Sequence, residues 1–246
     1  MSQYEDQIQL LQSGIDLNFW RNPEGVNIPD DDLSFLLIPD AVEAAAVFDL
    51  ARQVHEYQKS HAGESDQITS ALMVTMGGLL PSVLLFDHLV EGRYATVPKI
   101  LFGTIGVSLY KGPGQRYDNP LVQHGISIPV SGRTVLIIDD LADHGGTMNF
   151  LNKYIVESGA RKILTLAMYT KPAAQKVSSI DFCFGVTPQD TWIITPRERV
   201  ETLVKRVPIW KQSGASEKEC QRRLVELIGY PPEIVLVILC RLLHLL

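Results

Sequence analysis

Cysteine is scarce in this chain of 246 residues, with only Cys183, Cys220 and Cys240. Three cysteines so far apart do not form a disulfide framework, and their spacing matches no set of metal ligands. The scarcity predicts a protein of a reducing compartment, and we expect a cytoplasmic one.

Long apolar runs are lacking as well. The first ten residues have neither the basic start nor the apolar centre of a secretory signal. The most apolar run, residues 234–246, contains Arg241 and His244 and is shorter than the roughly 20 apolar residues that cross a bilayer. A packed or interfacial helix is expected there, and no membrane partner.

Positive charge is not in excess, because 22 Lys and Arg face 28 Asp and Glu for a net charge of −6. Proteins that bind nucleic acid non-specifically usually carry a basic field, so no nucleic-acid partner is expected. The hydrophobic fraction of 46% and the charged fraction of 20% are ordinary for a globular protein. An acidic net charge does not exclude a local anion-binding site within the protein.

Apolar runs alternate with helix-like segments from residue 40 onward. Residues 41–58 are expected to be helical because apolar side chains recur there at helical spacing. Further helices are expected at 79–90 and 147–158, and strands at 71–76, 99–109, 134–138, 162–169, 182–186 and 191–194. This alternation predicts an α/β fold with a central parallel twisted sheet flanked by helices. Ligands of such sheets bind at the carboxyl ends of the strands, where both glycine-rich turns of this sequence fall.

The two ends of the chain differ from this alternating region. Ser216 and Glu219 form a capping box that opens a helix, Gly229 ends it, and Pro231 begins another. We expect this helical hairpin to serve packing or dimerisation. The predicted organisation is an N-terminal accessory segment (1–39), a main domain (40–200) and a C-terminal helical extension (201–246).

The most informative stretch is IIDDLADHGGT, residues 137–147. A buried strand delivers the adjacent carboxylates Asp139 and Asp140 to the edge of the sheet, and Gly145, Gly146 and Thr147 follow where a helix begins. Backbone N–H groups at a helix N-terminus bind phosphate, while adjacent acids suit ribose hydroxyls and the waters of Mg²⁺. The stretch lacks the lysine of a P-loop and the spacing of a dinucleotide fingerprint.

This stretch resembles the phosphoribosyl diphosphate signature of the type I phosphoribosyltransferases. VTMGGLLPS (74–82) resembles the diphosphate-binding loop of the purine members, and SLYKGPGQR (108–116) resembles the start of their lid. TKPAA (170–174) and PQDTWI (188–193) resemble the purine-recognition segments of bacterial xanthine-guanine phosphoribosyltransferase. The five segments occur in the family's order.

The resemblance implies a glycosyltransferase of purine salvage. Such an enzyme transfers the phosphoribosyl group of phosphoribosyl diphosphate to hypoxanthine, guanine or xanthine and releases diphosphate. Mg²⁺ is the implied cofactor, and a homodimer or homotetramer is the implied assembly. By this resemblance Asp139 and Asp140 hold the ribose hydroxyls and, through water, Mg²⁺, while Asp143 is the general base at purine N7.

The resemblance also assigns the other site residues. Lys171 would donate to purine O6, Trp192 would stack on the ring, the backbone of Ile193 would read the base edge, and Glu198 would reach a second Mg²⁺. The residues implied to contact the ribose phosphate are Ala142, Asp143, His144, Gly145, Gly146 and Thr147. Those implied to contact the diphosphate are Met76, Gly77, Gly78 and Arg116. The implied lid residues are Ser108, Tyr110 and Lys111.

The lid is expected at residues 108–128. Gly112, Pro113, Gly114 and the Asn119–Pro120 pair predict a loop without regular structure, and such long loops often act as lids that exclude water. We therefore expect the lid to close over the diphosphate.

Two positions depart from the family's pattern. Met76 stands where Arg or Lys usually precedes Gly-Gly, and His144 replaces a small Ser or Thr. A charge-assisted hydrogen bond contributes about 1.5–3 kcal/mol, so the loss of a cation at position 76 would weaken diphosphate binding unless Arg116 or Lys111 replaces it. In some relatives this loop contains a non-proline cis peptide. Two alternatives stay open: a different acceptor base, or a non-catalytic regulator that senses phosphoribosyl diphosphate or a nucleotide.

Overall fold

The chain is described by a computed structural model that covers residues 14–112 and 115–243, without the side chains of 109–119 and 240–243. It forms two compact units. The first contains the described residues up to Arg21 and Ala44–Gln189, and the second contains Asn22–Glu43 and the described residues from Asp190 onward. None of the described helices is long and apolar enough to cross a membrane.

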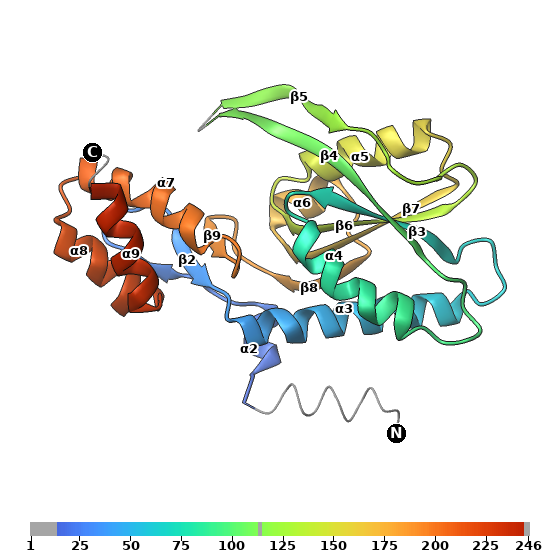
Figure 1. The fold of residues 1–246 in the computed structure, drawn as a ribbon, viewed down its shortest axis with the longest axis horizontal. Coiled ribbons are helices and arrows are strands. Elements are labelled where there is room, and N and C mark those ends of the chain that lie inside the picture. The colour runs from blue at the N-terminus through green and yellow to red at the C-terminus, as the bar shows by residue number, and fades with distance from the viewer. Residues whose placement is uncertain (1–13, 113–114, 244–246) are drawn as a thin grey trace. The chain divides into compact units, whose positions relative to one another are not determined.

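The first unit is built around a six-stranded sheet with the strand order β5-β4-β3-β6-β7-β8 (Figure 1). All its strands run parallel except β5, which is antiparallel to β4. This arrangement confirms the predicted α/β fold with a central, mostly parallel sheet. The strands are β3 (Ile68–Thr75), β4 (Leu101–Gly112), β5 (Gln115–His124), β6 (Thr134–Ala142), β7 (Lys162–Thr170) and β8 (Phe182–Val186).

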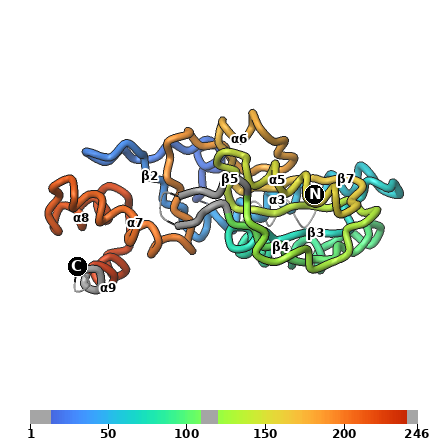
Figure 2. Tube along the Cα trace, turned by 90° about the horizontal axis from the view of Figure 1, so that it is seen from above, coloured from blue at the N-terminus to red at the C-terminus, as the bar shows by residue number. Residues whose placement is uncertain are grey.

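Helices cover both faces of this sheet. The apolar side chains of Val135 and Ile137 on β6 pack against Met148, Leu151 and Ile155 of α5 (Gly146–Glu157). On the other face lie α3 (Asp40–Ser60) and α4 (Leu79–Phe86), the latter continuing into the π-helical turn η1 (Asp87–Glu91) (Figure 1). The short α6 (Pro172–Val177) lies beside α5 (Figure 2), and α2 (Leu17–Arg21) contacts β8. Two layers of helices around a parallel sheet leave the carboxyl ends of its strands for a ligand.

The predicted lid differs in the structure. Residues 108–128 were expected to lack regular structure, but most of them belong to the antiparallel hairpin of β4 and β5, in which Ser108 pairs with Leu121 and Val107 with Val122. Pro120 is accommodated because β5 is the edge strand, where a missing N–H need not break a ladder. The expectation of a structureless loop is therefore wrong.

The second unit contains a small sheet in the order β1-β2-β9. Its strands are β1 (Val26–Asn27), β2 (Ser34–Leu37) and β9 (Thr191–Ile194), and its helices are α7 (Arg199–Gln212), α8 (Glu217–Arg222), η2 (Arg223–Ile228) and α9 (Pro232–Leu243). Residues 191–194 were expected to extend the central sheet. That expectation is wrong, because β9 pairs in parallel with β2 instead.

The C-terminal helices follow the predicted caps. The Ser216 hydroxyl accepts the backbone N–H of Glu219 at 3.2 Å, and Gly229 ends the π-helical turn with a φ of 90°. The next helix begins at Pro232, one residue after the predicted Pro231. Because β2 and β9 pair, the two compact units divide at residues other than 39 and 200. The predicted domains 1–39, 40–200 and 201–246 remain a prediction.

A buried carboxylate, Asp31, contacts two side chains of α7 within the second unit. The Asp31 side chain is 0% exposed, and both its oxygens lie 2.5 Å from an Arg206 nitrogen, while Trp210 donates to it at 2.6 Å. Burial alone would raise the pKa of Asp31, but the hydrogen bonds from Arg206 and Trp210 outweigh it and lower the pKa. The stability that this pair contributes is therefore present at neutral pH and is lost only as the pH falls below the ordinary range of aspartate.

Replacing Asp31 by alanine should lower the free energy of unfolding by about 3–5 kcal/mol, because the guanidinium of Arg206 would stay buried without its partner. Urea unfolding followed by circular dichroism measures this. Asp32→Ala, at the exposed neighbouring position, is the control and should change the value by no more than about 0.5 kcal/mol. Equal effects of the two substitutions would show that the ion pair is not a stabilising contact.

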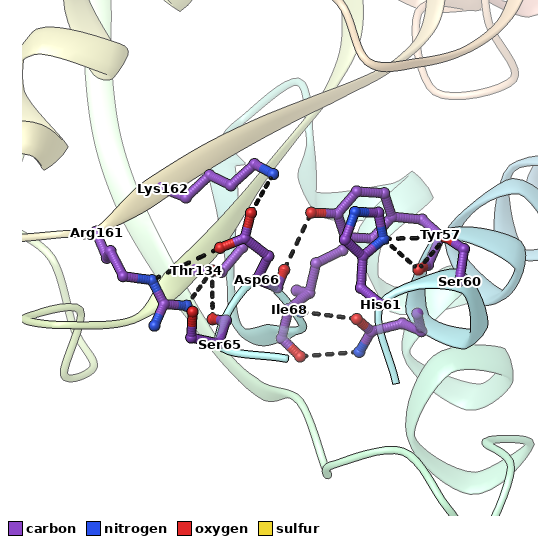
Figure 3. A network of polar contacts seen from close by, with 10 residues as sticks. Tyr57, Ser60, His61, Ser65, Asp66, Ile68, Thr134, Arg161 and Lys162 are labelled. Carbon is purple, nitrogen blue, oxygen red and sulfur yellow. Dashed lines mark hydrogen bonds and ion pairs between the residues drawn. The ribbon is translucent and has the colours of Figure 1, made fainter. Parts of the chain in front are cut away.

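A polar network ties the loop after α3 to the amino ends of β6 and β7 (Figure 3). Lys162 donates to the Asp66 carboxylate at 2.7 Å, and the Tyr57 hydroxyl donates to the backbone oxygen of Asp66 at 3.0 Å. Arg161 donates to the Thr134 hydroxyl at 2.8 Å. Because these contacts lie at the amino ends of the strands, we assign them to the scaffold and not to a ligand site.

A buried histidine, His55, and a partly buried one, His88, predict how stability depends on pH. His55 is 4% exposed, and its Nε2 lies 3.1 Å from the backbone oxygen of His88. Burial lowers the pKa of both histidines, so the folded protein stays neutral where the unfolded chain takes up protons. The free energy of unfolding should therefore fall as the pH drops below about 6.5. Urea titrations between pH 8 and 5.5 measure this, and His55→Gln should flatten the slope; an unchanged slope would contradict the assignment.

Candidate active site

Two carboxylates meet a glycine turn at the carboxyl ends of β6 and β3. Asp139 is 7% exposed, and its Oδ1 accepts the backbone N–H of Asp140 at 3.0 Å. A Cβ atom placed on Gly77 would collide with one oxygen of Asp139 and one of Asp140. Both acids therefore face the turn that follows β3.

The oxygen atoms of this pair fit Mg²⁺. In proteins this ion is usually held by one or two carboxylates together with waters and substrate phosphates, and not by a full cage of side chains. Among the side chains that the structure describes, no three His, Cys, Asp or Glu residues cluster to hold a metal. Asp139 and Asp140 are thus the residues that could hold the ion.

The turn after β3 lacks a basic side chain of its own. Met76 is 75% exposed, and the Thr75–Met76 peptide bond is cis. Lys111 lies on β4 and Arg116 on β5, but their side chains fall outside the described part of the structure. Gly78 is packed so closely that a Cβ there would collide with the backbone oxygen of Ile138. The backbone of the turn therefore lies directly against β6, and position 78 has no room for a side chain.

The N-terminus of α5 presents backbone N–H groups of the kind that bind anions. Gly145 precedes the helix with a φ of 75°, a conformation that favours glycine. The helix begins at Gly146, so the N–H groups of its first turn, including that of Thr147, have no partner within the helix. Such a terminus binds phosphate through these groups and the helix dipole.

Asp143 is the centre of the polar contacts between β6 and β7. Its Oδ1 lies 3.0 Å from Lys171 Nζ and accepts Gln189 Nε2 at 3.3 Å, while its Oδ2 lies 2.8 Å from His144 Nδ1. The backbone N–H of Lys171 also donates to the oxygen of Ala142 at 2.9 Å. The contact forms because Asp143 follows β6 and Lys171 follows the neighbouring β7.

Lys171 is not a solvated surface lysine, since its side chain is only 9% exposed. A buried ammonium beside a half-exposed carboxylate places a donor and an acceptor next to each other. Gln189 was not expected here, because a glutamine in a connecting segment carries no signal apart from its place within PQDTWI. His144, one of the two positions that depart from the resembled pattern, is directed to Asp143.

A comparison with protein families matches residues 43–198 to the phosphoribosyl transferase domain. The chain belongs to the phosphoribosyltransferase family. Members of this family are glycosyltransferases, so the resemblance that the motifs suggested is confirmed for fold and enzyme class.

Curated relatives align with about half of the residues of this phosphoribosyltransferase. The xanthine-guanine phosphoribosyltransferase of Idiomarina loihiensis is 28% identical over 132 residues, which are 54% of this chain and 72% of that protein. The enzyme of the same name from Nitratidesulfovibrio vulgaris (strain Hildenborough) is 29% identical over 129 residues, 51% of this chain and 66% of its own length.

Solved structures share the fold. The purine phosphoribosyltransferase of Pyrococcus horikoshii has a TM-score of 0.51 and 24% identity, covering 66% of this chain and 93% of that chain. The hypoxanthine phosphoribosyltransferase of Trypanosoma cruzi has a TM-score of 0.51 and 17% identity, covering 66% of this chain and 81% of that chain. At these identities the likeness establishes the fold alone.

Three predicted site residues of this phosphoribosyltransferase belong to its second unit. Trp192 donates through Nε1 to the Thr202 hydroxyl at 2.9 Å, and cations of Lys205 and Arg206 lie 5.9 and 5.8 Å from its ring centroid. Ile193 is 7% exposed, and Glu198 accepts the Thr195 hydroxyl at 3.1 Å and pairs with Arg197 at 3.3 Å. Their roles toward a base or a second Mg²⁺ stay predictions.

The predicted lid contacts lie on the hairpin of the first unit. Ser108 and Tyr110 belong to β4 with Lys111, and Arg116 pairs with Tyr110 across the hairpin. The side chain of Tyr110, like those of Lys111 and Arg116, falls outside the described residues. Their contact with diphosphate remains a prediction.

Proposed function

We propose that this protein transfers the phosphoribosyl group of phosphoribosyl diphosphate to a 6-oxopurine and releases diphosphate, with Mg²⁺ as cofactor. The observation that carries the proposal is the pair of Lys171 and Asp143, whose Nζ and Oδ1 lie 3.0 Å apart. The names of the curated relatives, xanthine-guanine phosphoribosyltransferases, support the same class of base.

The pair matches one edge of a 6-oxopurine. Atoms N7 and O6 are neighbours on that edge, so an ammonium can donate to O6 while a carboxylate accepts the N7 proton. Adenine carries an amino group at position 6, which would present hydrogens to Lys171 where an acceptor is needed. Hypoxanthine, guanine and xanthine all fit this edge, and the pair therefore selects against adenine but not among these three.

The other contacts suit phosphoribosyl diphosphate. Asp139 and Asp140 would accept the ribose hydroxyls, the first turn of α5 would bind the 5′-phosphate, and the turn at Gly77 and Gly78 would approach the diphosphate with its backbone. Mg²⁺ bound at the two acids would supply charge neutralisation for the leaving diphosphate. The β4–β5 hairpin would cover the diphosphate, as the family's lid does, and exclude water.

In the transfer one bond would form, one bond would break and one proton would move. The purine N9 forms a bond to the anomeric carbon while the bond from that carbon to the diphosphate oxygen breaks, and Asp143 accepts the proton from N7. When Lys171 turns to O6, the Asp143 carboxylate exchanges its cationic partner for the N7–H group of the base.

An assay with phosphoribosyl diphosphate, Mg²⁺ and each of hypoxanthine, guanine, xanthine and adenine tests the proposal, with diphosphate release and nucleotide formation both followed. Turnover of a 6-oxopurine and none of adenine is expected. Turnover of adenine alone would assign another acceptor class. Binding of phosphoribosyl diphosphate without turnover of any base would assign a sensing role. The proposed homodimer or homotetramer is measured by light scattering on the same sample.

Met76→Arg tests the missing cation of the diphosphate loop. A new charge-assisted hydrogen bond contributes about 1.5–3 kcal/mol, so the affinity for phosphoribosyl diphosphate should rise by roughly 10- to 100-fold. Isothermal titration measures the change, and Met76→Leu is the matched control that should leave the affinity as it is. An arginine variant with unchanged affinity would indicate that the backbone or another cation already serves the diphosphate.

A further inference from the structure

Gln189 makes two hydrogen bonds that fix its amide. The backbone N–H of Ala173 donates to Gln189 Oε1 at 3.0 Å, and Gln189 Nε2 donates to Asp143 Oδ1 at 3.3 Å. A backbone N–H can only donate, so the amide oxygen must face Ala173. The amide nitrogen is consequently held toward Asp143.

We infer that Gln189 is a positioning residue for Asp143, an inference that rests on the proposed role of Asp143 as the base. Oδ1 of Asp143 receives both Lys171 and Gln189, whereas Oδ2 faces His144. When Lys171 moves to purine O6, Gln189 becomes the donor that Oδ1 keeps. The carboxylate then stays oriented by Gln189 on one oxygen and His144 on the other.

The chemistry of the amide suits this task. A cation beside a carboxylate lowers its pKa by favouring the charged form, and so reduces its power as a base. A neutral amide gives a weaker hydrogen bond, which orients the carboxylate with less loss of basicity. The charged or titratable groups that contact Asp143 among the described residues are Lys171 and His144, so Gln189 is the neutral member of the set.

Gln189 also connects two elements of the site. It ends the first compact unit, in the segment after β8, while Ala173 lies in the first turn of α6, whose N-cap is Lys171. One side chain thus sets the distance between the base and the helix that carries the O6 donor. A misplacement on the order of 1 Å can slow a reaction by about 100-fold, so this restraint has a measurable consequence.

Gln189→Glu isolates the donated hydrogen bond. Glutamate keeps the size and can still accept from Ala173, but it replaces the donor by a like charge beside Asp143 and should raise the pKa of that carboxyl. The acid limb of the kcat/KM profile should move upward by about one pH unit. The matched control is Gln175→Glu, which adds the same charge at an exposed position of α6. Identical profiles for the two variants would overturn the inference.

Gln189→Leu tests orientation without added charge. We expect kcat to fall by roughly 10- to 100-fold while KM for phosphoribosyl diphosphate stays within about twofold, because only Asp143 loses its restraint. Thermal unfolding of each variant checks that the fold is kept. A fall in kcat with a matching rise in KM for phosphoribosyl diphosphate would point to general damage of the site and would also overturn the inference.

An NMR titration of the carboxyl carbon of Asp143 separates this inference from the proposed function. It is measured in the parent protein, Gln189→Glu and Gln175→Glu, and needs no turnover. A raised Asp143 pKa in Gln189→Glu alone supports the contact even if every base fails in the activity assay, in which case the proposed function is what has failed. Turnover of a 6-oxopurine with an Asp143 pKa that does not respond to Gln189→Glu would reject the inference and leave the proposed function standing.

Discussion

Replacing Asp143 by asparagine should slow phosphoribosyl transfer by about 10²–10⁴-fold, the usual contribution of a general base. Asparagine has nearly the same size and its oxygen can still accept from Lys171 and Gln189, so these two contacts are kept, and only the oxygen that faces His144 becomes an amide nitrogen. It cannot take a proton from purine N7 at neutral pH. The effect should therefore appear in kcat, measured at saturating phosphoribosyl diphosphate and base.

Binding of phosphoribosyl diphosphate distinguishes this role from a general weakening of the site. Asp143→Asn should bind it with nearly the parent affinity in isothermal titration, whereas Asp139→Asn should bind it clearly less well, because Asp139 faces the turn at Gly77, which we propose to approach the diphosphate. The exposed Asp87 provides a control, Asp87→Asn, that should change neither quantity. A kcat for Asp143→Asn within tenfold of the parent value would assign the proton to another acceptor, of which His144 is the nearest candidate.

Local elements of the fold could be predicted because their signals are local. The strand limits 182–186 and 191–194 agree with β8 and β9, since each is a short apolar run bounded by turn residues. The cap at Ser216 and the stop at Gly229 depend on neighbouring residues alone and were likewise found. Short-range patterning thus bounds these elements, whereas the expected strand 134–138 stops before the end of β6 at Ala142.

Pairing between distant segments could not be predicted in this way. An isolated apolar strand such as 191–194 fits the central sheet and a second sheet equally well, and the choice depends on β2, which lies far away in the sequence. The β4–β5 hairpin was missed for a related reason. Its glycines and prolines signal a loop, but cross-strand hydrogen bonds along an edge tolerate both.

The candidate site shows the same difference between what local patterns predict and what long-range contacts determine. Asp139, Asp140, Asp143 and Lys171 were assigned from motifs, and the structure brings the last two together at 3.0 Å. Gln189 joins them only because the segment after β8 passes Asp143. No local sequence pattern predicts this contact. Sequence identifies the residue types that chemistry needs, whereas the restraints on them come from the folded chain.

Alanine at Gly77 and alanine at Gly78 should affect different properties, namely ligand affinity at the first position and stability of the fold at the second. In Gly77→Ala the new Cβ meets the ends of the Asp139 and Asp140 side chains, which can rotate away. The fold should be kept, but the displaced carboxylates would lose their hydrogen bonds to the ribose. At about 1.5–3 kcal/mol for each charge-assisted bond, the affinity for phosphoribosyl diphosphate should fall by roughly 100-fold or more.

In Gly78→Ala the obstacle is backbone. The Cβ would collide with the oxygen of Ile138 and come within 2.9 Å of the nitrogen of Val74, and neither can move without disturbing β6 or β3. The backbone conformation itself is ordinary, with a φ of −73°, so the whole effect is steric. Overpacking of this kind lowers the free energy of unfolding by about 1–3 kcal/mol, and contact with fixed backbone places the expected value at the upper end.

Urea unfolding and isothermal titration of both variants test the contrast. Gly77→Ala should keep the parent's unfolding midpoint and lose affinity, whereas Gly78→Ala should unfold earlier whatever its affinity. A destabilised Gly77→Ala would mean that Asp139 and Asp140 are fixed members of the core. In that case the two acids would not be free to adjust to a ribose, and the assignment of the sugar to them would have to be abandoned.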